Sequence, residues 1–168
     1  DGCVTQYVPF TQRAWHAGIS YWKGETDINS HSIGIEIHNV GHSDGYPDFP
    51  RRQIAAVIAL TRDICARNAI RPEGVLAHSD VAVARKIDPG EKFSWSALAR
   101  AHVGLWVRPT PVRDDDAGLG IGARGADIDE AQRLLAAFGY NIKHNGVLDD
   151  AAAKVITAFQ RHFRPKRI

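Results

Sequence analysis

The chain has 168 residues, of which 44% are hydrophobic and 24% are charged, a composition typical of a globular protein with a substantial core. Its 21 Lys and Arg against 19 Asp and Glu leave a formal charge of +2, too small an excess to predict a nucleic-acid-binding groove. No stretch approaches the roughly 20 apolar residues of a membrane-spanning helix, and the opening DGCVTQYVPF does not resemble a signal peptide.

The N-terminal part alternates between strand-like and helical patterns. Residues 2–8 alternate after a turn and predict the end of a hairpin, and the β-branched run SIGIEI at 32–37 predicts a largely buried strand. Residues 75–77 predict a further short strand. Apolar residues at helical spacing predict a long helix over about 52–68 and a shorter one over about 95–102. These elements predict an α/β domain with a mixed central sheet flanked by helices.

The composition changes after this domain. The segment RPTPVRDDDAGLGIG, residues 108–122, is rich in Pro, Gly and Asp and predicts a linker. Two amphipathic helices are then predicted, over 128–138 and 151–163, with Asp149 or Asp150 as the N-cap of the second. This small all-α module is marginal in size, so a further helix is expected beyond the chain. The predicted division is a catalytic domain at 1–107, a linker at 108–122 and a helical module at 123–168.

Four residues carry a possible hydrolytic site. His78 and Asp88 offer an imidazole nitrogen and a carboxylate, both good zinc ligands, and catalytic zinc commonly keeps three protein ligands and an open position. Glu36, in the SIGIEI strand, could accept a proton from water that the metal activates. Lys86 could stabilise the negative oxygen that develops on a cleaved amide.

The same residues have simpler explanations. His78 could cap a helix or lie on the surface, Lys86 could be a solvated charge, and Asp88 could begin the Asp-Pro-Gly turn. Glu36 is harder to explain in this way. Because isoleucines flank it on both sides, the strand pattern predicts a buried carboxylate that needs a partner.

Several motifs also carry a resemblance to a known family. The segments RAWHAG (13–18), SIGIEI (32–37), AHSDVAVARKIDPG (77–90) and FSW (93–95), in this order, resemble the type 2 N-acetylmuramoyl-L-alanine amidases. The similarity covers about residues 1–107 and is nearest to bacterial envelope amidases with an additional C-terminal domain. It implies a zinc hydrolase that cuts the amide bond between N-acetylmuramic acid and L-alanine in peptidoglycan.

The resemblance assigns roles to the four residues. It implies that His78 and Asp88 are zinc ligands, that Glu36 is the catalytic acid and base, and that Lys86 steadies the transition state. The family's first zinc ligand is a histidine on an early strand, upstream of Asp1. We therefore expect the chain to be a fragment, with a natural short form that has an incomplete site as the alternative. With two ligands, zinc affinity should fall by orders of magnitude unless water or a spare histidine such as His38 fills the gap.

Three further residues are expected on the substrate side. His16, in RAWHAG, belongs to the family pattern beside the substrate cleft and is not expected to bind metal. Trp15 offers an aromatic face for sugar or peptide, although packing also explains it. Asn29 matches a position near the strand entrance, where turn formation is the simpler explanation.

The C-terminal segment resembles the helical peptidoglycan-binding module found behind many wall hydrolases, over about residues 129–165. The expected partners are peptidoglycan and muropeptides, with no nucleic acid, and a monomer in the periplasm or cell envelope is expected. Membrane attachment is expected only through a segment upstream of Asp1. The alternative function is a noncatalytic peptidoglycan-recognition protein with a degenerate metal site.

Overall fold

The structure is a computed structural model that describes residues 2–112, 115 and 117–168. Helices are the only regular elements in this part of the chain. The α-helices are α1 (Ile28–His31), α2 (Arg51–Asn68), α3 (His78–Val81), α4 (Trp95–Arg100), α5 (Ala126–Phe138) and α6 (Asp150–Phe163), and the 3₁₀ turns are η1 (His42–Asp44), η2 (Pro72–Gly74) and η3 (Pro165–Arg167). None of the helices in these ranges is both long enough and apolar enough to cross a bilayer.

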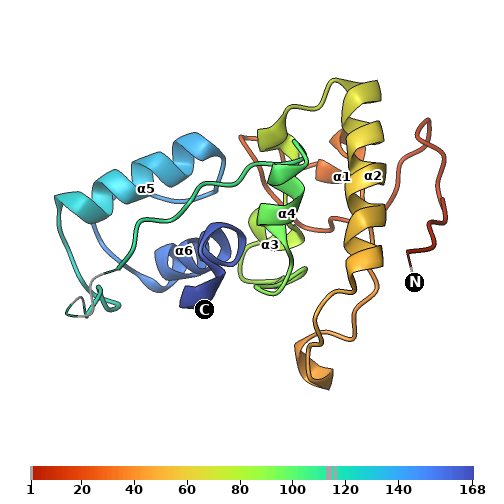
Figure 1. The fold of residues 1–168 in the computed structure, drawn as a ribbon. Helices are drawn as coiled ribbons and strands as arrows, with labels where there is room; N and C mark the ends of the chain where they lie inside the picture. Colours follow the sequence, from red (N-terminus) through yellow and green to blue (C-terminus); the bar gives the residue numbers. More distant parts are fainter. Residues whose placement is uncertain (1, 113–114, 116) are drawn as a thin grey trace.

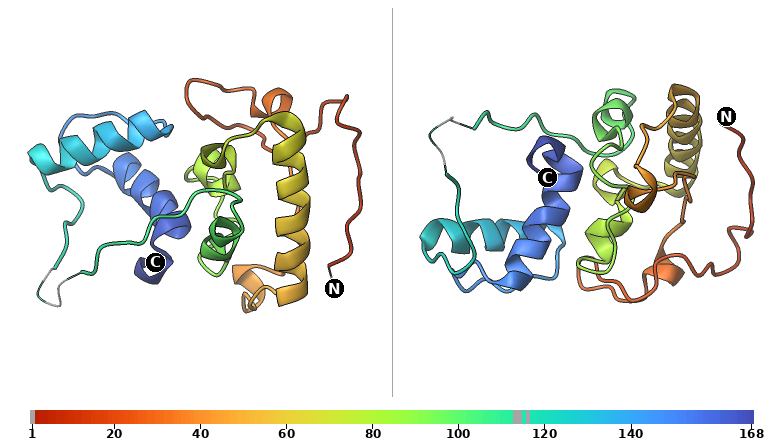
Figure 2. Two further views of the ribbon diagram at one scale, coloured as in Figure 1. Left: turned by 45° about the horizontal axis from the view of Figure 1, so that its top comes forward. Right: turned by 90° about the horizontal axis from the view of Figure 1, so that it is seen from below.

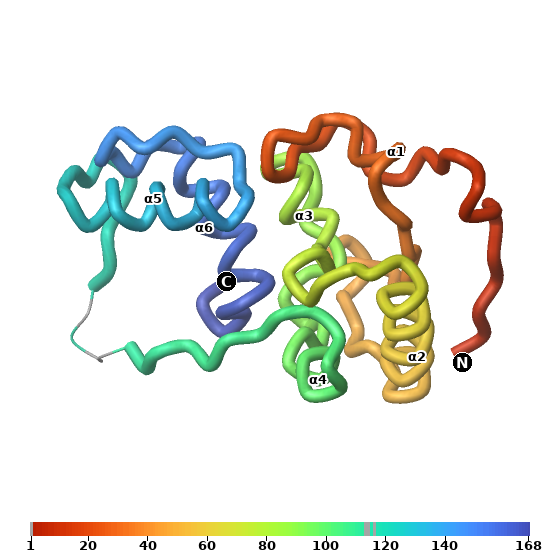
Figure 3. The backbone as a smooth tube through the Cα atoms, turned by 90° about the horizontal axis from the view of Figure 1, so that it is seen from above, coloured from red at the N-terminus to blue at the C-terminus, as the bar shows by residue number. Residues whose placement is uncertain are grey.

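The elements lie in a row across the molecule (Figures 1 and 3). The N-terminal arm lies on the outer side of α2, where Gly2 meets the backbone of Arg52. The short helices α3 and α4 lie between α2 and α6, and α5 lies at the far end. Figure 2 shows that the segment after α4 passes α6 before α5 begins. The guanidinium of Arg164 donates to the carbonyl of Thr110 on this segment.

The predicted central sheet is wrong for this part of the chain. The described residues contain isolated bridges, between Trp22 and Glu25 and between Arg124 and Val147, but no strand. Residues 33–37 show the predicted alternation, with half-buried isoleucines between exposed residues. A strand also needs a neighbouring backbone that accepts and donates hydrogen bonds in register, and no described segment provides one. The alternation therefore predicted the side-chain orientation correctly and the sheet incorrectly.

The two helices predicted from periodicity in the N-terminal part, α2 and α4, both form. Helix α2 buries one face of regular helical spacing, through Ile54, Val57, Thr61 and Ile64, and ends where Ala69 adopts a left-handed conformation. Its apolar residues pack against α4 in a core formed by Ile54, Val57, Ala77, Phe93, Trp95, Leu98 and Val103. This packing, rather than helical propensity, holds the six-residue α4 in place, because isolated helices of that length are unstable in water.

The C-terminal helices also form as predicted. Asp149 caps α6, where its Oδ1 accepts a hydrogen bond from the backbone N–H of Ala152 at 2.8 Å. Gly139 ends α5 with φ of +149°, and a Cβ there would lie 2.5 Å from the Trp22 ring. The aspartate run of the predicted linker lies partly outside the described residues, because 114 and 116 are not among them.

One core joins the N-terminal and C-terminal parts. It contains residues from α3, α5 and α6, from the segment before α1 and from the residues just after α3 and α5, namely Trp22, Val81, Ala82, Leu135, Tyr140, Val155 and Ala158. The Trp22 ring packs edge-on against Tyr140, with 5.0 Å between ring centroids. The C-terminal helices therefore bury apolar surface of the N-terminal part as well as their own.

Candidate functional site

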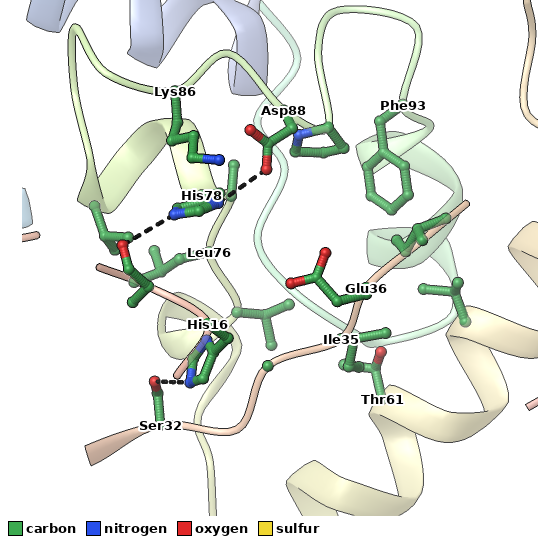
Figure 4. A pocket seen from close by; sticks show the side chains of 18 of the residues that line it. His16, Ser32, Ile35, Glu36, Thr61, Leu76, His78, Lys86, Asp88 and Phe93 are labelled. Atoms are coloured by element: carbon green, nitrogen blue, oxygen red, sulfur yellow. Dashed lines mark hydrogen bonds and ion pairs between the residues drawn. The ribbon is translucent and has the colours of Figure 1, made fainter. Parts of the chain in front are cut away.

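A cavity of about 760 Å³ lies between α2, α4, the extended segment 32–37 and the loop that follows α3. Among the residues that line it are His16, Glu36, His78, Lys86 and Asp88. Figure 4 shows them around one space, although they come from parts of the chain far apart in sequence. The structure thus brings together five of the seven predicted site residues.

His78 and Asp88 are in direct contact. His78 is the first residue of α3, and its Nδ1 lies 3.0 Å from Oδ2 of Asp88. The hydrogen bond to Asp88 raises the pKa of the His78 imidazole against the opposing effect of burial, and the carbonyl of Ala17 adds to the rise. The same hydrogen bond lowers the pKa of the Asp88 carboxyl. In the absence of a metal ion these shifts favour a protonated His78 imidazole paired with the Asp88 carboxylate.

The surroundings of His78 suit a metal ligand. Its Nε2 lies 3.0 Å from the carbonyl oxygen of Ala17, so Nε2–H donates to that carbonyl and Nδ1 is the nitrogen that faces Asp88. Metal-binding histidines commonly donate their other N–H to a carbonyl in this way. A separation of 3.0 Å is also close to that between two ligands of one tetrahedral zinc ion, about 3–3.5 Å.

Two donors are present at this point, and the described residues contain no group of three His, Cys, Asp or Glu side chains placed to hold one metal ion. His38, considered as a spare ligand, is exposed. Its backbone carbonyl accepts a hydrogen bond from the Gln53 side chain at 2.7 Å. The imidazole of His78 and the carboxylate of Asp88 nevertheless fit zinc in donor chemistry, as two of the three protein ligands of a catalytic zinc site.

Glu36 differs from expectation in its burial. The sequence predicted a buried carboxylate with a partner, but the side chain is exposed to the cavity. The reason is the alternation of the extended segment, which directs Ile35 toward Thr61 of α2 and Glu36 to the opposite side. Figure 4 shows its carboxylate directed into the space that His78 and Asp88 also face. Lys86 is half-buried and extends toward the same space.

His16 forms another wall of the cavity. Its Nε2 lies 3.3 Å from the Ser32 hydroxyl, and burial is the main cause that lowers the pKa of its imidazole. The ring packs on Gly34, where a Cβ would lie 2.5 Å from the ring carbon Cγ. The glycine that interrupts the SIGIEI run is therefore required by the close approach of His16.

Gly34→Ala is expected to destabilise the fold by about 1–3 kcal/mol, because the new methyl group must displace the His16 ring or the extended segment. Urea unfolding measures this change. Gly120→Ala is the matched control, since a Cβ at Gly120 would have no heavy atom within 4 Å. Equal midpoints for the two variants would contradict the packing of His16 on Gly34.

Asn29 and Trp15 do not line the cavity, but each is the sequence neighbour of a residue that does. Asn29 is buried, and its Oδ1 accepts hydrogen bonds from the backbone N–H groups of His16 at 3.0 Å and Ala17 at 2.8 Å. It therefore holds the loop that carries His16. Trp15 is 80% exposed, and the Arg13 guanidinium lies 3.9 Å from its ring centroid.

The sequence did not single out Tyr46, which braces the loop that carries Asp88. Its hydroxyl donates to the carbonyl of Pro89 at 2.6 Å and accepts the backbone N–H of Lys92 at 3.0 Å. Gly90 packs against the same hydroxyl. The turn-rich segment HSDGYPDFP gave no sign of this contact, because a tyrosine in a loop is common and its partner lies 43 positions away.

Arg85, the neighbour of Lys86, was also not predicted as a site residue. Its guanidinium donates to the carbonyls of Ala17 at 2.5 Å and Ile19 at 2.9 Å. The Ala17 carbonyl is the one that also accepts His78 Nε2–H. Arg85 therefore fixes the acceptor that orients the His78 ring.

The chain matches two protein families in sequence. Residues 1–91 match the N-acetylmuramoyl-L-alanine amidase family, and residues 124–167 match a putative peptidoglycan binding domain. The N-acetylmuramoyl-L-alanine amidase AmiD of Escherichia coli K12 is 42% identical over 169 residues, which cover 96% of this chain and 60% of AmiD. The 1,6-anhydro-N-acetylmuramyl-L-alanine amidase AmpD of Enterobacter cloacae is 42% identical over 96 residues, covering 57% of this chain and 49% of AmpD.

Solved structures agree with these matches. E. coli AmiD in complex with the substrate anhydro-N-acetylmuramic acid-L-Ala-D-gamma-Glu-L-Lys has a TM-score of 0.74 at 38% identity, over 96% of this chain and 64% of that one. AMPDH3 from Pseudomonas aeruginosa, in complex with anhydromuramic pentapeptide, has a TM-score of 0.70 at 34% identity, over 95% and 64%. The chain thus spans less than two thirds of the length of these relatives. Since the amidase match covers more than half of the 168 residues, the chain belongs to the N-acetylmuramoyl-L-alanine amidase family.

Proposed function

We propose that this protein hydrolyses the amide bond between N-acetylmuramic acid and L-alanine in peptidoglycan, with zinc held by His78 and Asp88. The observation that carries the proposal is the convergence of the His78–Asp88 pair, Glu36 and Lys86 on one cavity. The similarity to amidases solved with muropeptides supports this choice of bond. The cavity volume of about 760 Å³ lies within the usual range for small-ligand sites, about 300–1,000 Å³.

The chemistry divides among the four residues. Zinc supplies Lewis-acid chemistry, activating water near neutral pH and polarising a carbonyl. Glu36 takes the proton of the attacking water and returns it to the amine nitrogen of L-alanine as the carbon–nitrogen bond breaks. The Lys86 ammonium stabilises the negative charge that develops on the carbonyl oxygen. The exposure of Glu36 to the cavity supports its role, because a buried carboxylate could not reach substrate.

Substrate contacts are proposed for the loop that carries His16. His16 lines the cavity, and Trp15 presents an exposed ring on the adjoining loop. Asn29 contributes through its bonds to the backbone of that loop, which hold His16 in position. A flat indole face suits contact with a sugar or a peptide bond.

The C-terminal helices, residues 123–168, are proposed to bind the wall, and the match to a peptidoglycan binding domain supports this. The polar loop 141–149 is the proposed contact surface. The proposed division keeps residues 1–107 as the catalytic part and 108–122 as the linker, in a monomer of the periplasm or cell envelope, where peptidoglycan lies. The shared core around Trp22 means that the two parts act as one packed unit.

The test is hydrolysis by the full-length protein loaded with zinc. With a soluble anhydro-muropeptide as substrate, we expect release of a peptide with a free L-alanine amino terminus, detected by mass spectrometry. Tight binding of the muropeptide without cleavage would favour the noncatalytic recognition protein instead. Cleavage between sugars or within the peptide would contradict the assigned bond.

A further inference from the structure

A buried polar network joins the C-terminal helices to the start of α3. At its centre is Asp80, which is 1% exposed. Its Oδ1 accepts the Tyr140 hydroxyl at 2.5 Å, and its Oδ2 accepts His162 Nδ1–H at 2.7 Å and the backbone N–H of Ala77 at 2.8 Å. Two of these three donors come from residues more than 50 positions away, in the peptidoglycan-binding part of the chain.

Both distant donors are fixed by packing. His162 is 1% exposed and lies between rings, with centroids 3.8 Å from Trp95 and 4.0 Å from Phe163. Its Nε2 has no hydrogen-bond partner among the described residues, so the imidazole ring makes its hydrogen bond there through Nδ1, to Asp80. Tyr140 is 2% exposed, and burial together with the neighbouring Asp80 carboxylate raises the pKa of its hydroxyl, which keeps it protonated as a donor.

Asp80 in turn holds the helix that carries His78. Helix α3 has four residues, too few to be stable without tertiary contacts. The Asp80 carboxylate caps its first turn through the N–H of Ala77, the residue before His78. The neighbouring Ser79 N–H donates to the backbone carbonyl of Asp88 at 3.0 Å. The same short turn therefore sets the positions of both proposed ligands.

We propose that His162 and Tyr140 are positioning residues for the hydrolytic site: from the C-terminal helices they hold the Asp80 carboxylate, and through it the orientation of His78 toward Asp88. The peptidoglycan-binding part then serves catalysis as well as wall binding. Only the expected effect on turnover rests on the proposed function of the His78–Asp88 pair. The placement of His78 itself can be observed without metal or substrate.

The test uses full-length protein and four variants, of which Tyr140→Phe is the fourth. His162→Phe keeps a ring between Trp95 and Phe163 but removes the donor, and His162→Asn keeps a donor at the same number of bonds from the backbone. Phe159→Leu is the control, since this residue packs in the same core and makes no bond to Asp80. Zinc affinity is measured by competition with a chromophoric chelator, and kcat and KM on a soluble muropeptide that does not depend on wall binding.

We expect His162→Phe to lower zinc affinity by about 10-fold and to lower kcat with little change in KM, the low end of the effect of removing a residue that orients a metal ligand. His162→Asn should recover most of both. Tyr140→Phe, which keeps the ring against Trp22, should act in the same direction as His162→Phe. Phe159→Leu should lower the unfolding midpoint without changing zinc affinity.

Imidazole ¹⁵N NMR of His78 in the metal-free protein provides a readout independent of activity. His162→Phe should shift the His78 nitrogens and the Ser79 amide, whereas Phe159→Leu should not. Equal shifts, or equal zinc affinities, in these two variants would overturn the positioning role. A wild-type protein without turnover, combined with the expected NMR difference, would instead overturn the proposed function and leave the positioning role standing.

Discussion

Glu36→Gln is expected to reduce kcat by about 10²–10⁴-fold, the usual contribution of a positioned acid and base. Glutamine keeps the shape of the side chain but cannot take the proton from water. Zinc content should stay unchanged, because among the described residues Glu36 makes no hydrogen bond or ion pair with His78 or Asp88. Turnover of a soluble muropeptide and metal analysis of the same sample measure the two quantities.

Glu130→Gln is the matched control for this variant. Glu130 lies on α5, where its carboxylate pairs with Arg133 at the surface, so the same chemical change should leave kcat unaltered. Parallel loss of zinc and activity in Glu36→Gln would identify Glu36 as a metal ligand or a structural residue. An unchanged kcat would remove it from the mechanism.

His78→Ala is expected to lower zinc affinity by more than about 100-fold and to reduce hydrolysis to background. The loss of a residue that only orients a metal ligand already costs about 10–100-fold, and His78 is proposed to be a ligand itself. The substitution also leaves Asp88 without its hydrogen-bond partner. Chelator competition and the soluble-substrate assay are the measurements.

His38→Ala is the control, because His38 is exposed and was the spare histidine considered for the gap in the metal site. It should leave affinity and turnover unchanged. If His38→Ala lost zinc as His78→Ala does, His38 would have to be counted among the ligands. If His78→Ala kept full zinc affinity, the proposed metal site would lie elsewhere.

The two substitutions separate zinc binding, which His78→Ala tests, from proton transfer during hydrolysis, which Glu36→Gln tests. His78 Nδ1 and Asp88 Oδ2 are in contact at 3.0 Å, whereas the Glu36 carboxylate is separate from the pair and is directed into the space that both residues face. The assigned roles would therefore be reversed if Glu36→Gln lowered zinc affinity, or if His78→Ala lowered kcat without lowering zinc affinity.

The sequence by itself determined the three long helices and the family. The periodicity over 52–68, the capping Asp149 and the glycine after Phe138 depend on local spacing and backbone preference, and α2, α5 and α6 form as these features predict. The motifs around Glu36 and His78 likewise depend on residue type at short spacing, and they identified the family correctly.

Tertiary structure decided the rest, because pairing and burial depend on distant residues. The SIGIEI run has strand propensity and alternation, yet no described segment pairs with it, so no sheet forms there and Glu36 faces the cavity instead of a core. The same limit applies to Asp80. Nothing near it in sequence indicates that Tyr140 and His162 complete its hydrogen bonds, since these contacts exist only after the C-terminal helices pack on α3.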